Sequence, residues 1–126
     1  MLTEQINAAI TFLKTTDLEK TTHFYTNILR LPLVLDQGNC RIFRILPGAY
    51  VGFCTQDSAP DNREIILTLV LEDVDSACIA LAEAGVPIEV QPRYNEQYQI
   101  YQCFARDPNG YLIEIQRFHD PCWKGD

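Results

Sequence analysis

The chain has 126 residues, of which 47% are hydrophobic and 21% are charged, and its formal net charge is −7 at pH 7. These values predict a soluble globular protein of one domain, and the lack of any Lys or Arg run argues against nucleic acid as a partner. No apolar run approaches the roughly 18 residues that a membrane span needs, and the N-terminus lacks a signal-peptide pattern, so no membrane partner is expected.

The five cysteines are Cys40, Cys54, Cys78, Cys103 and Cys122. Their odd number and wide spacing, without any C-x-x-C pair, indicate neither a zinc site nor a disulfide framework. All but the last lie in apolar patterns, where a free thiol behaves as a small hydrophobe. A cytosolic (cytoplasmic) location is therefore expected.

The first half of the chain predicts the order β-α-β-β-β. A strand over residues 8–14 is followed by Thr16-Asp17-Leu18-Glu19, a capping-box pattern that begins a helix. Three strands are expected after this helix, over 33–35, 40–45 and 50–54. The buried stripe expected on the helix consists of Leu18, Thr22, Tyr25 and Leu29.

The second half predicts the same order. A strand over residues 65–71 leads to Asp73, which caps a helix that ends at Gly85. Strands are then expected over 99–104 and 111–118. The buried stripe expected on this helix consists of Val74, Cys78, Leu81 and Ala84.

The two halves therefore form an internal repeat, in which Asp17 matches Asp73. A repeat of this length predicts two modules of one fold within a single domain. The predicted segments are a first module over about 6–55, a polar linker over about 56–63, a second module over about 64–118 and a tail over 119–126.

One carboxylate interrupts the last strand. Asp107-Pro108-Asn109-Gly110 fits a type I turn, and the apolar strand after it contains a single acid, Glu114. Because burying an unpaired carboxylate is costly, Glu114 either faces solvent or points into a cavity.

Four segments occur in a fixed order, and they are Asp17-Leu18-Glu19-x4-Phe24-Tyr25, Glu72-Asp73-Val74-Asp75, Ala84-Gly85-Val86-Pro87 and Asp107-Pro108-x-Gly110-x3-Glu114. Together they resemble the vicinal oxygen chelate superfamily, whose members include glyoxalase I, bleomycin-resistance proteins and extradiol dioxygenases. The resemblance implies an α+β fold in which two βαβββ modules form a mixed eight-stranded sheet curled around a central cleft.

Enzymes of that superfamily hold a divalent metal in the cleft, with ligands from the first and last strands of each module. The resemblance puts Glu114 at one ligand position, and Ile10 and Ile66 at the two first-strand positions. The last strand of the first module offers Phe53, or Gly52 if the alignment slips by one. Because zinc takes about four N, S or O ligands and hard cations about six, we expect no metal and no other cofactor.

Two further positions bear on the resemblance. His23 is expected to be exposed on the first helix, and His119 belongs to a tail whose Trp123 packs on the body of the protein. Arg30 stands where the family usually has Gly at the end of the first helix, which costs about 1 kcal/mol if that residue is left-handed.

Strand alternation predicts which side chains face the cleft. They would form an aromatic and aliphatic pocket with a few polar groups, as small-molecule sites do. The alternative is a filled core in which Glu114 pairs with Arg41 or Lys14. The expected ligand-binding residues are Glu114, Gln102, Gln116, Arg41, Phe12, Lys14, Phe53 and Phe104. The other side chains expected on the cleft face are Ile10, Phe43, Ile66, Thr68, Val70 and Leu112.

Two functions are consistent with such a pocket. A metal-free binding protein of the bleomycin-resistance type would hold an apolar or aromatic ligand, including a cationic one that meets Glu114. Alternatively, a lyase, isomerase or dioxygenase of the superfamily would use Glu114 as a general base or have an unconventional metal site. Binding is favoured, because the sequence places no second acid or base.

A homodimer is expected, since the exposed edges of two open sheets favour pairing between copies. Tyr94, Tyr98 and Trp123 are expected in loop or tail positions, where they serve an interface or a lid. The polar stretch 91–97 is the segment predicted to form that lid.

Overall fold

The computed structural model describes residues 2–60 and 64–125. The chain divides into two units, 1–61 and 62–126, each of which is described on its own. The predicted linker over 56–63 therefore lies partly outside the described residues. No helix in the described part of the chain is long and apolar enough to cross a membrane.

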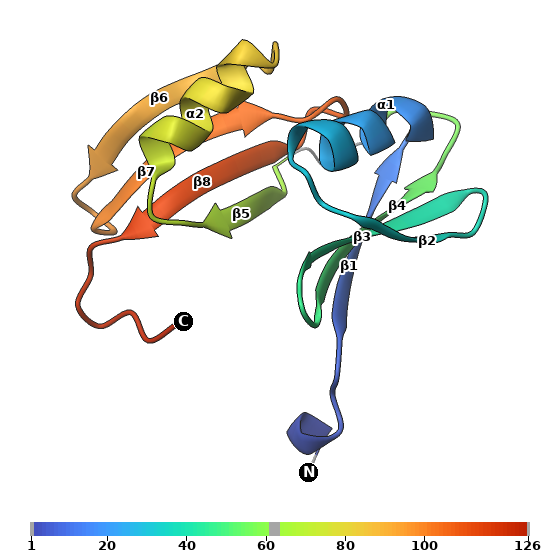
Figure 1. Ribbon diagram of the computed structural model, residues 1–126, viewed down its shortest axis with the longest axis horizontal. Helices are drawn as coiled ribbons and strands as arrows, with labels where there is room; N and C mark the ends of the chain where they lie inside the picture. The colour runs from blue at the N-terminus through green and yellow to red at the C-terminus, as the bar shows by residue number, and fades with distance from the viewer. Residues whose placement is uncertain (1, 61–63, 126) are drawn as a thin grey trace. The chain divides into compact units, whose positions relative to one another are not determined.

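The first unit has the predicted β-α-β-β-β order (Figure 1). Its sheet has the strand order β1-β4-β3-β2, in which β1 pairs with β4 in parallel and the other pairs are antiparallel. A short 3-10 turn, Leu2–Glu4, precedes the sheet. The remaining elements are β1 (Ala9–Thr15), α1 (Leu18–Thr22), the π-helix η2 (His23–Ile28), β2 (Leu33–Asp36), β3 (Cys40–Leu46) and β4 (Ala49–Thr55).

The second unit repeats this order and this pairing. Its sheet has the strand order β5-β8-β7-β6, with β5 parallel to β8. The elements are β5 (Ile66–Val70), α2 (Val74–Glu83), β6 (Ile88–Asn95), β7 (Ile100–Arg106) and β8 (Leu112–Phe118). The structure confirms the α+β class and the two βαβββ modules.

Each helix begins at an aspartate. The carboxylates of Asp17 and Asp73 accept from the backbone N–H of Lys20 and Ser76, at 3.0 Å in both helices. The cap of α1 is thus Asp17, and the capping box that was predicted from Thr16 does not form. Each aspartate thereby satisfies a backbone N–H group that has no partner within the first turn of its helix.

The first helix changes its winding after one turn, which the sequence pattern did not predict. In η2 the N–H of Leu29 donates to the carbonyl of Phe24, five residues earlier, at 2.9 Å. The wider turn puts Phe24 and Tyr25 side by side in the core. The buried residues are therefore Leu18, Thr21, Phe24 and Tyr25, which corrects the predicted stripe.

The core of each unit lies between its helix and one face of its sheet. In the first unit the Tyr25 ring packs on Phe43 and Phe53, with ring centroids 5.7 and 4.8 Å apart. In the second unit, α2 covers buried side chains of β7 and β8, as Figure 1 shows for the arrangement of these elements. We call the opposite side of each sheet its helix-free face.

The predicted turn before β8 forms and fixes the start of that strand. The N–H of Gly110 donates to the carbonyl of Asp107 at 3.0 Å, closing the turn. The buried Asp107 carboxylate accepts from the backbone N–H groups of Asn109 and Tyr111, at 2.9 and 2.8 Å. These bonds fix the point at which β8 begins, and they thereby fix the place of Glu114 in the sheet.

Arg30 gives a stability test. Its φ is +66°, the left-handed conformation anticipated for it, while Gly85 at the end of α2 has φ +83°. Replacing Arg30 with Gly should raise the free energy of unfolding by about 1 kcal/mol, because Gly adopts this conformation without a Cβ penalty. Urea unfolding followed by circular dichroism measures the change.

The matched control is Gly85→Ala. Nothing lies within 4 Å of a Cβ built at Gly85, so the substitution causes no steric clash. Its effect should come from the backbone conformation alone, and it should lower the free energy of unfolding by a similar amount. An Arg30→Gly variant that unfolds at lower urea than the wild type would contradict the interpretation.

Candidate functional site

Glu114 is the centre of a hydrogen-bond network on the helix-free face of the second sheet. Its Oε1 accepts from the Thr68 hydroxyl at 2.7 Å, and its Oε2 accepts from the Gln102 amide. The Oε1 of Gln102 in turn accepts from the Asn95 amide at 2.9 Å. One residue comes from each of β5, β6, β7 and β8, so the network spans the whole sheet.

Strand pairing explains why these side chains meet. Glu114 lies beside Thr68 in the parallel pair β5–β8 and opposite Phe104 in the antiparallel pair β7–β8. Residues that face each other across paired strands share a face of the sheet. The shared face predicted for the second module is confirmed for Ile66, Thr68, Val70, Gln102, Phe104, Leu112, Glu114 and Gln116.

A buried acceptor without a hydrogen-bond partner among the described residues lies beside this network. Gln116 is 7% exposed, and no hydrogen bond in the described part of the chain reaches its Oε1. Glu114 is 9% exposed, and both of its oxygens are held by neutral donors. Around these polar groups the same face carries exposed Ile66 and Val70. A fixed carboxylate and an unsatisfied amide oxygen therefore stand among apolar side chains.

The first sheet has an aromatic ring where the second has its carboxylate. Phe12 lies beside Gly52 in the β1–β4 register, as Thr68 lies beside Glu114 in β5–β8. A Cβ added to Gly52 would come within 2.6 Å of the Phe12 ring, which fills that space. The counterpart of Glu114 is thus Gly52, which the one-residue slip had allowed, and the assignment of Phe53 is wrong.

Three residues predicted for the cleft face point to the helix instead, and they are Arg41, Phe43 and Phe53. Phe53 is fully buried against Tyr25. Arg41 donates to the Thr22 hydroxyl at 2.8 Å and to Glu19 at 3.0 Å, and the hydrogen bond with Glu19 raises the pKa of its guanidinium. The repeat alignment was out by one residue in these strands, and a shift of one residue reverses the face.

Phe12 and Lys14 lie on the helix-free face of the first sheet, in register with Gly52 and Cys54. Arg41 finds its acidic partners within its own unit, because it binds Glu19 and lies 3.3 Å from Asp36. Whether any of these residues binds a ligand stays a prediction.

The four positions that match the superfamily's metal ligands do not make a ligand set. They are Ile10, Gly52, Ile66 and Glu114, which together supply one carboxylate. Within residues 2–60 and 64–125, no three His, Cys, Asp or Glu side chains come together as a metal site would require.

The histidines and the tail lie as predicted. His23 is exposed on the first helix and contacts Asn27. Trp123 stacks on Phe118 with ring centroids 4.1 Å apart, so the tail packs on the second unit. The predicted lid over 91–97 is wrong for most of its length, because residues through Asn95 belong to β6 and pair with β7.

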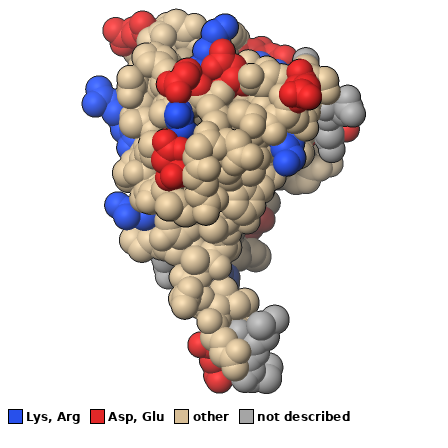
Figure 2. Space-filling view, turned by 90° about the vertical axis from the view of Figure 1, so that its right-hand side faces the viewer, with Lys and Arg blue, Asp and Glu red and all other residues tan. Residues whose placement is uncertain are grey.

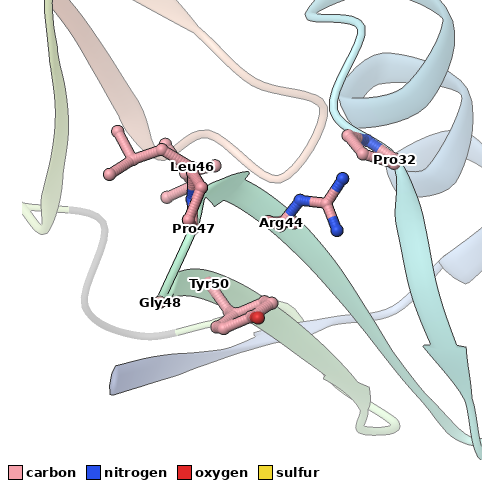
Figure 3. A pocket seen from close by; sticks show the side chains of 7 residues that line it. Pro32, Arg44, Leu46, Pro47, Gly48 and Tyr50 are labelled. Atoms are coloured by element: carbon pink, nitrogen blue, oxygen red, sulfur yellow. The ribbon is translucent and has the colours of Figure 1, made fainter. Parts of the chain in front are cut away.

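Two hollows accompany these faces. One of about 500 Å³ lies where β3 turns into β4, and Figure 3 shows the Arg44 side chain directed toward Pro32 with Tyr50 at the opposite wall. The other, of about 600 Å³, is lined by Arg93, Tyr94, Asn95 and Glu96, and so reaches the Asn95 end of the Glu114 network. No sequence motif predicted the first hollow, because its lining residues come together only through the β3–β4 hairpin.

On the face shown in Figure 2, basic side chains lie singly among acidic ones, around a broad uncharged area.

The Glyoxalase/Bleomycin resistance protein/Dioxygenase superfamily matches residues 6–115. The chain therefore belongs to this superfamily, as its four motifs and its two modules indicated. None of the curated proteins compared with the chain matches it.

Solved structures share the fold at low sequence identity. A glyoxalase/bleomycin resistance protein/dioxygenase from Nocardioides is 17% identical, with a TM-score of 0.78 over 99% of this chain and 95% of that one. An integron cassette protein from the Halifax Harbour sewage outfall metagenome is 22% identical, with a TM-score of 0.77 over 88% of this chain and 97% of that one. A glyoxalase/dioxygenase from Nostoc punctiforme is 16% identical, with a TM-score of 0.72 over 91% of both chains.

The Phe12–Gly52 contact can be tested with a double-mutant cycle. Gly52→Ala should destabilise the wild type by about 1 kcal/mol or more, because the new methyl group overlaps the ring. In a Phe12→Ala background the same change should be neutral or stabilising, since Ala suits a strand better than Gly does. Urea unfolding of the four proteins gives the coupling, and equal effects of Gly52→Ala in both backgrounds would contradict the contact.

Proposed function

We propose that this protein binds a small organic molecule without a metal ion, and that the Glu114 network on the helix-free face of the second sheet is the polar part of the site. The proposal rests on two groups that lie on the same face of the sheet. One is the Glu114 carboxylate, which its hydrogen bonds hold in one orientation, and the other is the buried Oε1 of Gln116, which has no hydrogen-bond partner in the described residues. Buried acceptors are almost always satisfied, so one left open beside a carboxylate suits a ligand with donor groups.

The chemistry of this face defines the class of ligand. Glu114 and Gln116 both present oxygens, which favours a ligand that carries N–H or O–H donors, and a cationic one above all. Exposed Ile66 and Val70, with Phe104 opposite Glu114, supply apolar contact area for the remainder of the molecule. An apolar or aromatic amine is the simplest compound that satisfies both requirements.

The absence of a metal from the proposal rests on the donors that the chain offers. Hydrocarbon side chains stand at two of the four superfamily positions, and the third, Gly52, is covered by a phenyl ring. The residues present do not fit a divalent cation, and we derive no step through one.

Catalysis by Glu114 as a general base is the second candidate. The observation in its favour is that two neutral donors hold the carboxylate in one orientation among apolar side chains, as proton abstraction requires. Against it, the network offers no charged group to stabilise the anion that abstraction would create. The binding function is therefore the stronger proposal.

We further propose that the protein acts in the cytosol as a homodimer. Exposed apolar side chains on the first sheet, among them Ile10, Phe12 and Leu35, provide area that association would bury. Light scattering during size exclusion should give twice the monomer mass of 14.4 kDa. A single species at the monomer mass would contradict the dimer.

The role of Glu114 is tested by a thermal-shift and calorimetric screen of aromatic amines against matched neutral alcohols. Glu114→Gln should weaken the binding of a cationic hit by about 10- to 100-fold, since it removes a charge-assisted hydrogen bond worth roughly 1.5–3 kcal/mol. Glu83→Gln on the exposed side of α2 removes the same charge elsewhere and should leave the affinity unchanged.

Two measurements decide the metal-free part of the proposal. Elemental analysis of the purified protein should find no stoichiometric Zn, Fe, Mn or Ni, and a chelator should leave the affinity for the hit unchanged. A stoichiometric metal would overturn the metal-free part of the proposal. Turnover of any screened compound by chelated protein, abolished in Glu114→Gln, would favour the enzyme instead.

A further inference from the structure

Two thiols face each other across the first sheet. Cys40 in β3 lies directly opposite Cys54 in β4, and their sulfur atoms are 2.6 Å apart. The N–H of Thr55 donates to the carbonyl of Asn39 at 2.9 Å, which makes Cys40 and Cys54 a pair without ladder hydrogen bonds of its own. Such pairs have Cα atoms about 4.5 Å apart, within the range that a disulfide spans.

We propose that Cys40 and Cys54 form a redox modification site, at which a peroxide converts the two thiols into a reversible disulfide across β3 and β4. Both residues lie on the helix-free face, on strands that are already paired. The bond therefore needs no rearrangement of the backbone, only a movement of the two side chains.

The reaction balances with one hydrogen peroxide. The thiolate of Cys54 attacks one peroxide oxygen, the O–O bond breaks, and water leaves after protonation, so that Cys54 becomes a sulfenic acid. The sulfur of Cys40 then attacks the Cys54 sulfur, and hydroxide leaves and takes the Cys40 proton as a second water. Two thiols are oxidised, one peroxide is reduced, and a thiol reductant reverses the change.

The surroundings assign the order of the two steps. Burial, together with the hydrogen bond between the sulfurs, raises the pKa of Cys40 to about 11, so this thiol stays protonated at neutral pH. Cys54 is more exposed than Cys40, so a peroxide from solvent reaches its sulfur first. The attacking residue is therefore Cys54.

The other cysteines provide internal comparisons. Cys78 and Cys103 are almost completely buried between α2 and its sheet, and burial raises the pKa of Cys103 to about 12. Both should resist a peroxide that reaches Cys54. Cys122 is exposed in the tail and free, so it reports how an accessible thiol outside this pair reacts.

The test is peptide mapping of wild-type protein treated with hydrogen peroxide, then denatured, alkylated and digested with trypsin. Cleavage after Arg30, Arg41, Arg44 and Arg63 separates Cys40 from Cys54, so the disulfide joins the peptides 31–41 and 45–63. Free thiols should fall from five to three, and dithiothreitol should restore them.

Single variants separate this site from general oxidation. Cys40→Ser should stop at a dimedone-reactive sulfenic acid on Cys54, whereas Cys122→Ser should form the linked peptide as the wild type does. Five free thiols after treatment, or a linked peptide that contains Cys122 in place of the 31–41 and 45–63 pair, would overturn the proposal. Because the wild-type map alone decides, a variant that fails to fold does not affect the outcome.

Discussion

A buried carboxylate has to be hydrogen-bonded, and that requirement organises the second sheet of this protein. Glu114 obtains its partners from the two strands that flank β8, and Gln102 passes the network on to β6. Each bond depends on the register of a strand pair, so a slip in β5–β8 or in β7–β8 would cost the carboxylate one of its two donors. The network thereby selects one register for the sheet and holds its own oxygens in one orientation.

The comparison of the two modules shows how a repeat can keep its fold while its sites diverge. Parallel pairing of the first and last strands recurs in both sheets, as β1–β4 and β5–β8. At the equivalent positions one module has Thr68 beside Glu114, and the other has Phe12 covering Gly52. Because Gly52 has no side chain, the Phe12 ring occupies the space above it, and this position is apolar where the second module has a carboxylate.

Most of the fold was predictable because it rests on local signals, namely the helix caps at Asp17 and Asp73 and the turn at Asp107. The helix-free face of β5, β7 and β8 was also predictable, since these strands alternate without interruption, whereas β6 was not, because its pairing with β7 is irregular. The first module was assigned with an error of one residue in both β3 and β4, and the error arises in the hairpin before them. Leu33 pairs with Phe43, whereas its counterpart Ile88 pairs with Ala105, and the alignment allowed one residue too few for this longer β6–β7 hairpin. An error of one residue is harmless for locating a strand, but it reverses every statement about which side chain faces a ligand.

Two features could not have been predicted from the sequence for a different reason, namely that they depend on pairing between strands. Cys40 and Cys54 are separated in the chain and carry no spacing motif, and only the β3–β4 register brings their sulfurs together. Gln102 likewise lies opposite Gln116 only through the β7–β8 register, but its amide donates to Glu114, and no hydrogen bond in the described residues reaches the Gln116 Oε1. Both features lie on helix-free faces. In each module the helix encloses a conventional apolar core, so the chemistry that distinguishes this chain is confined to the opposite side of each sheet, where stability demands less of the sequence.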